Sequence, residues 1–164
     1  ATGDFIQQAF LIKKVLAPHN IPLIINDRVD VALAVDADGV HIGQSDMPYS
    51  IVRRLLGYEK IIGLSVENIE QVHQANTLDV DYIGISPVFS TPTKTDTALP
   101  FGLEGVKEVM SISKHRAVAI GGINMDNAAQ VIKAGAHGVA VVSAICSAQQ
   151  PREAALKLKG LIAK

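Results

Sequence analysis

AVAIGGINMDNAAQVIKAGAHGVAVV, residues 117–142, is the most informative part of the sequence for the fold. Two short apolar runs flank one helical pattern, in the order Ala117–Ile120, Asp126–Ala134 and Gly138–Val142. Short apolar runs bounded by glycine are typical of buried parallel strands. Asn124 and Asp126 are candidate caps for the helix, and Gly135 is its stop signal. The stretch is therefore predicted to form one strand–helix–strand unit.

The same alternation extends toward the amino end of the chain. Further strand-like runs are Pro22–Ile25, Gly39–Ile42, Lys60–Leu64 and Tyr82–Ile85. Further helical patterns are Phe5–Leu16, Asp30–Ala34, Tyr49–Leu56, Ile69–Ala75, Leu103–Ser111 and Arg152–Ile162. Alternating strands and helices with short connections predict an α/β fold with a parallel sheet. No low-complexity linker interrupts the pattern, so residues 1–164 are predicted to form a single domain.

A closed barrel is favoured over a doubly wound open sheet. The glycine fingerprint of dinucleotide-binding open sheets is absent. Small or polar residues follow the carboxyl end of every predicted strand, where barrel enzymes place their sites. The fold class is therefore a (β/α)8 TIM barrel of which about six β/α units are present, namely strands 3–8. Six strands leave two unpaired edges, so the first two strands are expected to be missing from the sequence.

Composition excludes several classes of protein. Aromatic residues make up only 4% of the chain, so Ile, Val, Leu and Ala must build the core. The net charge of −1 gives no basic footprint for nucleic acid, and no apolar run is long enough for a membrane span. No signal peptide is recognised, and the single Cys146 cannot form an internal disulfide, so a cytoplasmic location is expected. A homo-oligomer is compatible with the sequence.

Asp27 and Asp46 are candidate metal ligands. Each follows a different strand, and the two strands are neighbours in sequence, so their carboxylates can converge at one rim. Two carboxylates suit Mg²⁺, which keeps several waters and the phosphates of its substrate. The alternative is that Asp27 caps the next helix and Asp46 stabilises a turn before Pro48. The spacing does not decide between these interpretations.

Two late loops and one long loop are candidate phosphate sites. Gly121-Gly122 and Val142-Ser143 each lie between a strand and a helix, at the two strand ends where this fold often binds phosphate. Glycines that merely permit tight turns are the alternative. The hydroxyl-rich loop Ser90–Thr97 carries Lys94 and could bind phosphate oxygens, although its composition alone favours a solvated loop. His41 and Cys146 are expected to be packing residues rather than a base and a nucleophile.

In order along the chain, seven segments resemble thiamine phosphate synthase, a TIM-barrel enzyme of the thiamine monophosphate synthase and thiazole tautomerase superfamily. The segments are Pro22–Asp30, Ala37–Asp46, Ile62–Ser65, Asp81–Gly84, Pro87–Lys94, Ala119–Ile123 and Gly138–Ser143. The glycine segments are generic to phosphate-binding barrels. Asn-Asp-Arg-Val-Asp, Gly-Gln-Ser-Asp and Thr-Pro-Thr-Lys together are specific.

The resemblance implies a transferase that joins hydroxymethylpyrimidine pyrophosphate to thiazole phosphate with Mg²⁺ as cofactor. Asp27 and Asp46 would hold the metal ion. Asn26 and the catalytic residues Ser65 and Lys94 would contact the pyrophosphate. The thiazole phosphate would be bound by Thr91, Thr93, Gly122, Val142 and Ser143. The implied chemistry is ionisation at the pyrimidine methylene, loss of pyrophosphate and attack by the thiazole nitrogen, which agrees with the absence of a recognisable general base.

The family also carries a Gln-x-Arg-x-Lys motif after its second strand, and this sequence begins just beyond that position. Three explanations are open. The sequence covers only part of the protein, or the segment with the motif is disordered in the sample, or the protein is truly truncated. In the last case we expect little or no activity. A thiazole tautomerase would need a catalytic histidine where this chain has Ser86-Pro87. A non-catalytic protein that binds thiamine precursors is the alternative from another class.

Overall fold

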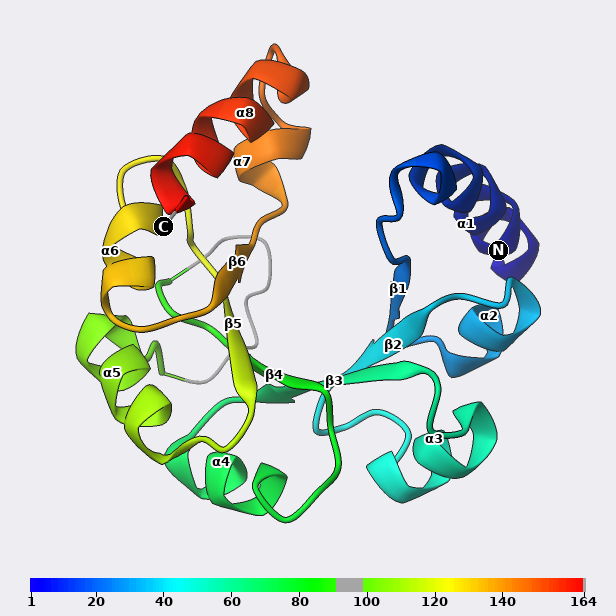
Figure 1. The fold of residues 1–164 in the computed structure, drawn as a ribbon, viewed down its shortest axis with the longest axis horizontal. Coiled ribbons are helices and arrows are strands. Elements are labelled where there is room, and N and C mark those ends of the chain that lie inside the picture. Colours follow the sequence, from blue (N-terminus) through cyan, green and yellow to red (C-terminus); the bar gives the residue numbers. More distant parts are fainter. Residues whose placement is uncertain (91–98, 164) are drawn as a thin grey trace. The chain divides into compact units, whose positions relative to one another are not determined.

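The structure is a computed structural model that describes residues 1–90 and 99–163. Figure 1 labels the elements. The strands are β1 (Ile24–Asn26), β2 (Gly39–Ile42), β3 (Ile61–Val66), β4 (Tyr82–Ile85), β5 (Arg116–Ile120) and β6 (Gly138–Ala140). The helices are α1 (Thr2–Leu16), α2 (Val29–Ala34), α3 (Tyr49–Leu56), α4 (Ile69–Ala75), α5 (Gly102–Ile112), α6 (Ala128–Lys133), α7 (Ser143–Cys146) and α8 (Pro151–Ile162), with a 3₁₀ turn η1 (Ala17–His19). Strands and helices alternate from β1 to β6, which confirms the predicted α/β class.

The chain forms two compact units, Ala1–Ser65 and Val66–Lys164, and the boundary falls inside β3. Each unit is described by itself. The prediction of a single domain over the whole chain stays a prediction.

In unit 1, parallel pairing joins β1 to β2 and β2 to β3. The register places Ile25 opposite Val40 and Val40 opposite Ile62, and all three side chains are buried. Gly39 lies so close to Ile61 that a Cβ atom at this position would overlap the Ile61 carbonyl oxygen. The tight approach of β2 to β3 therefore requires glycine at the start of β2.

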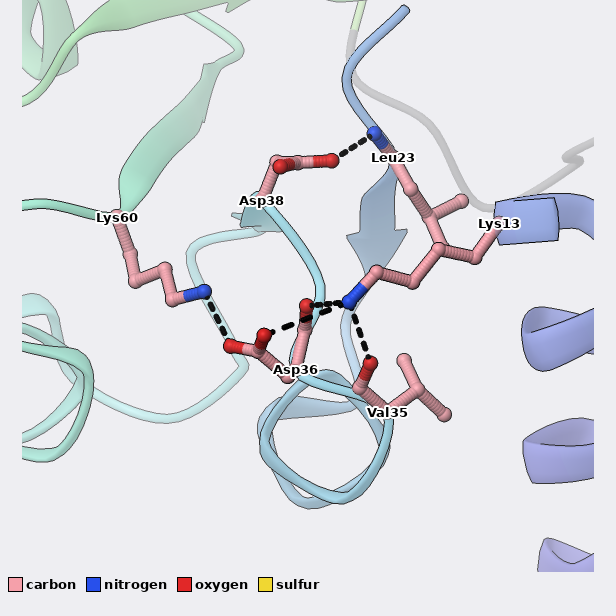
Figure 2. A network of polar contacts seen from close by, with 6 residues as sticks. All are labelled: Lys13, Leu23, Val35, Asp36, Asp38 and Lys60. Carbon is pink, nitrogen blue, oxygen red and sulfur yellow. Dashed lines mark hydrogen bonds and ion pairs between the residues drawn. The ribbon is translucent and has the colours of Figure 1, made fainter. Parts of the chain in front are cut away.

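A polar network ties together the amino-terminal ends of the strands of unit 1 (Figure 2). Lys13 of α1 donates to the carbonyl oxygens of Val35 and Asp36, and Lys60 lies 2.5 Å from the Asp36 carboxylate. The Asp38 carboxylate accepts a 2.7 Å hydrogen bond from the Leu23 backbone. Lys60 and then Lys13 hold the pKa of Asp36 below its usual value by hydrogen bonding and charge attraction. This end of the strands serves stability, because barrel sites lie at the carboxyl ends.

In unit 2, parallel pairing joins β4 to β5 and β5 to β6. Ile83 and Ile85 of β4 lie opposite Ala117 and Ala119 of β5, and all four are fully buried. Large residues on one strand thus face small ones on the next, which fills the layer without overlap. In Figure 1, α4, α5 and α6 lie on the same side of these strands. One-sided helices follow from right-handed crossovers between successive parallel strands.

The predicted strands are all present, with ends that differ by up to two residues. The last strand ends at Ala140 rather than Val142, because the chain turns there into the short helix α7. The sequence analysis missed α7 and η1, which are single turns with no apolar periodicity. No helix of residues 1–90 and 99–163 is long and apolar enough to cross a membrane.

The predicted caps of α6 were wrong. Asn124 and Asp126 lie in the preceding turn, where the Asn124 side chain accepts a bond from the Asp126 backbone. Asn127 is the N-cap residue, and its side chain accepts from the Asn124 backbone and donates to the Gly122 carbonyl oxygen. These local bonds compete with the helix and delay its start to Ala128. The predicted stop at Gly135 is confirmed, since its φ is 117°.

Candidate functional site

Asp27 lies at a sharp turn immediately after β1. Its backbone N–H donates to the His41 carbonyl oxygen at 2.8 Å, which extends the β1–β2 pairing by one residue. The Arg28 backbone then donates to the Asn26 carbonyl oxygen at 2.7 Å, and Asp27 adopts a φ of 63° at the centre of this turn. Left-handed backbone in a residue other than glycine is uncommon and concentrates at functional sites. The N-cap residue of α2 is Arg28, so the helix-cap alternative for Asp27 was wrong.

Asp46 closes the turn that follows β2. Its Oδ2 accepts a 2.6 Å hydrogen bond from the Gly43 backbone, and its own backbone N–H donates to the Gly43 carbonyl oxygen at 3.3 Å. The predicted turn role of Asp46 is thus confirmed. The same bond fixes the carboxylate in place through one oxygen and does not involve the other. The turn role and a metal role are therefore compatible.

Asp27 and Asp46 carry the type of ligand group that magnesium prefers. Both follow the carboxyl ends of adjacent parallel strands: Asp27 comes directly after β1, and Asp46 lies in the turn after β2, whose Gly43 it bonds. No cluster of three or more His, Cys, Asp or Glu suited to a metal occurs in residues 1–90 and 99–163. Mg²⁺ does not need such a cluster, since one or two carboxylates, waters and substrate phosphates commonly complete its shell.

Ser65 lies near the carboxyl end of β3, half-buried, and is held by two residues from the β2 side. Its Oγ lies 2.9 Å from His41 Nε2, and its carbonyl oxygen accepts a 2.6 Å hydrogen bond from Gln44 Nε2. Burial lowers the pKa of His41, and the Asp46 charge opposes that shift. The sequence analysis expected His41 to be a packing residue and gave Gln44 no role of its own. The contact to Ser65 depends on the register of β2 and β3, which no sequence pattern specifies.

In unit 2, Gly121 and Gly122 follow β5 with φ values of 98° and 64°. A Cβ atom on Gly121 would lie 2.8 Å from Pro87 Cβ, and one on Gly122 would lie 2.8 Å from the Ser90 carbonyl oxygen. The Phe89 backbone donates to the Gly121 carbonyl oxygen at 3.0 Å. Both glycines are therefore required for the packing of two loops. Loop packing alone explains why glycine occupies these two positions, and it does not test the predicted phosphate role.

Val142 and Ser143 form the start of α7, directly after β6. Both residues are exposed, and Val142 is the N-cap residue. Gly122, Val142 and Ser143 thus follow adjacent strands, because β5 pairs with β6. Exposed backbone at a strand end that enters a helix is a common setting for phosphate binding. Predicted site residues Thr91, Thr93 and Lys94 lie outside the described residues.

The predicted site residues thus fall into two groups at the carboxyl ends of strands. In unit 1 these are Asn26, Asp27, Asp46 and Ser65, and in unit 2 they are Gly122, Val142 and Ser143. The first group combines two carboxylates with amide and hydroxyl donors, which suits a metal-bound phosphorylated ligand. The second group offers backbone and one hydroxyl, which suits a second phosphate.

Comparison with known proteins gives a consistent result. A sequence profile of the family described as "Thiamine monophosphate synthase" matches residues 1–145. A "Thiamine-phosphate synthase" of Albidiferax ferrireducens is 58% identical over 161 residues, which are 98% of this chain and 74% of the relative. One of Vibrio campbellii is 54% identical over 158 residues, 96% of this chain and 78% of the relative.

A solved structure agrees with these relatives. "Thiamine phosphate pyrophosphorylase" from Pyrococcus furiosus superposes with a TM-score of 0.91 at 37% sequence identity, covering 99% of this chain and 77% of that chain. The TIM-barrel class predicted from the sequence is therefore confirmed by this likeness.

Proposed function

The chain belongs to the thiamine monophosphate synthase family of transferases, and we propose that its two groups of strand-end residues bind the two halves of thiamine phosphate. The observation that carries the proposal is the position of Asp27 and Asp46 after the carboxyl ends of adjacent strands. Ser65, near the carboxyl end of the next strand, is held by His41. The substrates are hydroxymethylpyrimidine pyrophosphate and thiazole phosphate, and the products are thiamine phosphate and pyrophosphate.

Unit 1 is proposed to bind the pyrophosphate. Asn26 and Ser65 donate hydrogen bonds to its oxygens. The resemblance to the family also implies a pyrophosphate contact from Lys94, which lies outside the described residues. The carboxylates of Asp27 and Asp46 would hold Mg²⁺, which supplies neutralisation of the charge that develops on the pyrophosphate. Support comes from the fixed position of the Asp46 carboxylate, whose Oδ2 is already engaged by the Gly43 backbone. A carboxylate that needs no reordering loses little entropy on metal binding.

Unit 2 is proposed to bind the thiazole phosphate. Gly122, Val142 and Ser143 present backbone groups and a hydroxyl at adjacent strand ends, and Thr91 and Thr93 are proposed to complete this site. Ser143 is exposed and lies in the first turn of α7, so its side chain is accessible to an anion. A bound phosphate restrains the thiazole substrate, which lowers the entropic part of the barrier.

The proposed reaction breaks the bond between the pyrimidine methylene carbon and the pyrophosphate oxygen. The electron pair leaves with the pyrophosphate, and the lone pair of the thiazole nitrogen then forms the new carbon–nitrogen bond. No proton transfer is needed at the reacting carbon, so the residues of the chain bind, orient and neutralise charge. We place the reaction in the cytoplasm, because both substrates are charged biosynthetic intermediates that do not cross apolar layers.

The test is thiamine phosphate formation with and without Mg²⁺ for Asp27→Asn and Asp46→Asn. In Asp46→Asn, the side-chain amide oxygen can still accept the Gly43 bond, so this change removes charge and leaves the turn intact. Both variants should lose at least about 100-fold in Mg²⁺-dependent turnover, as expected when an electrostatic contact to a leaving group is lost. Binding of thiazole phosphate, measured by calorimetry, should be unchanged.

Asp36→Asn is the matched control. It removes one carboxylate at the opposite end of the strands and should keep full turnover at neutral pH. If Asp27→Asn and Asp46→Asn were as active as this control, the metal assignment would be wrong. If the wild-type protein made no thiamine phosphate at all, the proposed reaction itself would fail.

A further inference from the structure

The imidazole of His41 belongs to none of the groups assigned so far, although it touches one of them. His41 is the third residue of β2 and lies opposite Gly63 of β3 in the register. Ser65 is two residues beyond Gly63, so it lies on the same face of the sheet as His41. Because Gly63 has no side chain, the imidazole can lean diagonally across β3, and Nε2 lies 2.9 Å from Ser65 Oγ.

We propose that His41 is a positioning residue that donates its Nε2–H to Ser65 Oγ and so directs the Ser65 hydroxyl proton at the pyrophosphate. The proposal rests on the function proposed above. A hydroxyl has one proton and two lone pairs. If Nε2 instead accepted a hydrogen bond from the Ser65 hydroxyl, the serine would present only oxygen lone pairs to the pyrophosphate. An anion repels these lone pairs. Donation by Nε2 leaves the proton of Ser65 free to bond a phosphate oxygen.

The surroundings of Ser65 support this arrangement. Gln44 Nε2 holds the Ser65 carbonyl oxygen at 2.6 Å, so the backbone and the side chain of the serine are fixed by separate residues. His41 is also half-buried between neighbours Val40 and Ile42, which are fully buried and anchor β2. A serine that is oriented before the substrate binds has less freedom to lose on binding.

The experiment is a double-mutant cycle with His41→Phe, Ser65→Ala and the combined variant. Two readouts are measured: turnover, and binding of inorganic pyrophosphate with Mg²⁺ by calorimetry. Loss of a residue that orients a ligand group commonly costs about 10–100-fold, and we expect His41→Phe to lower turnover within that range. In the Ser65→Ala background the same change should have less than about a threefold effect, because His41 acts through Ser65.

Three further variants or measurements separate positioning from folding. His41→Gln places an amide N–H near the position of Nε2 and should recover most of the activity. His115→Phe is the matched control, since His115 is also half-buried and bonds a carbonyl oxygen, that of Ala75, at 2.9 Å. Its loss should leave turnover unchanged. ¹⁵N NMR of the His41 ring should show the proton on Nε2.

An undiminished loss from His41→Phe in the Ser65→Ala background would overturn the proposal, as would a ring proton found on Nδ1 alone. Wild-type protein that binds pyrophosphate but forms no thiamine phosphate would refute the proposed function. In that case the pyrophosphate affinities of the four proteins in the cycle still decide the role of His41.

Discussion

Replacing Gly121 with alanine tests how the two loops of unit 2 are held together. Gly121 follows β5 with a φ of 98°, a conformation that side chains other than glycine rarely adopt. A Cβ atom there would lie 2.8 Å from Pro87 Cβ, 2.9 Å from Pro87 Cα and 3.2 Å from the Val88 backbone nitrogen. Two of these three atoms are backbone, so a side-chain rotation cannot relieve the contact. The loop that begins at Pro87 must move.

Two costs add in this variant. Left-handed backbone for alanine costs about 1–3 kcal/mol. Overpacking against a well-packed neighbour costs about 1–3 kcal/mol. The free energy of unfolding should therefore fall by about 2–6 kcal/mol, which is a large part of the roughly 5–15 kcal/mol of a typical domain. With a urea slope of about 2 kcal/mol per M, the midpoint should drop by about 1–3 M.

The assay is urea unfolding followed by circular dichroism and by tyrosine fluorescence. Gly160→Ala is the control, because Gly160 lies within α8 and an added Cβ meets nothing within 4 Å. That change should raise stability by about 0.5–1 kcal/mol, the helix preference for alanine over glycine. A Gly121→Ala midpoint equal to that of the wild type would refute the reasoning, since neither the strain nor the overlap would then exist.

Two further predictions concern the ends of the strands. Ser143→Asp should weaken thiazole phosphate binding about 100-fold by charge repulsion, measured by calorimetry, whereas Ser147→Asp at the end of α7 should have little effect; unchanged affinity for Ser143→Asp would exclude the phosphate assignment. Asp36→Asn should reduce stability at neutral pH but not in strong acid. The pKa of Asp36 is lower in the folded protein than its unfolded value of 3.8, so the ionised carboxylate stabilises the fold above pH 3.8. This stabilisation is lost as the pH falls through the folded-state pKa. The difference in urea midpoint between Asp36→Asn and the wild type should shrink at high salt; a difference independent of pH and salt would contradict this role for Asp36.

The order of strands and helices could be predicted from the sequence, and so could the position of most candidate site residues after strand ends. The roles of these residues stay predictions. Hydrophobic periodicity and the turn residues between elements carry this information, because a buried strand needs a short apolar run and a tight turn needs glycine or a capping residue. Gly39–Ile42 and Tyr82–Ile85 were predicted with the bounds that the structure has. The resemblance to a family supplied the chemistry, since Asp27 and Asp46 by themselves left a structural alternative open.

Contacts between strands and between loops emerged only when the chain was folded. The bond from His41 to Ser65 depends on the register of β2 and β3, and a slip of one residue would turn His41 to the other face. The caps of α6 were mispredicted because Asn124 and Asn127 bond each other across a turn. Likewise, the sequence marks Gly121 as a turn residue but cannot show that Pro87 lies against it. Local propensity specifies which elements form, whereas distant residues come into contact only through the packing of the elements that carry them.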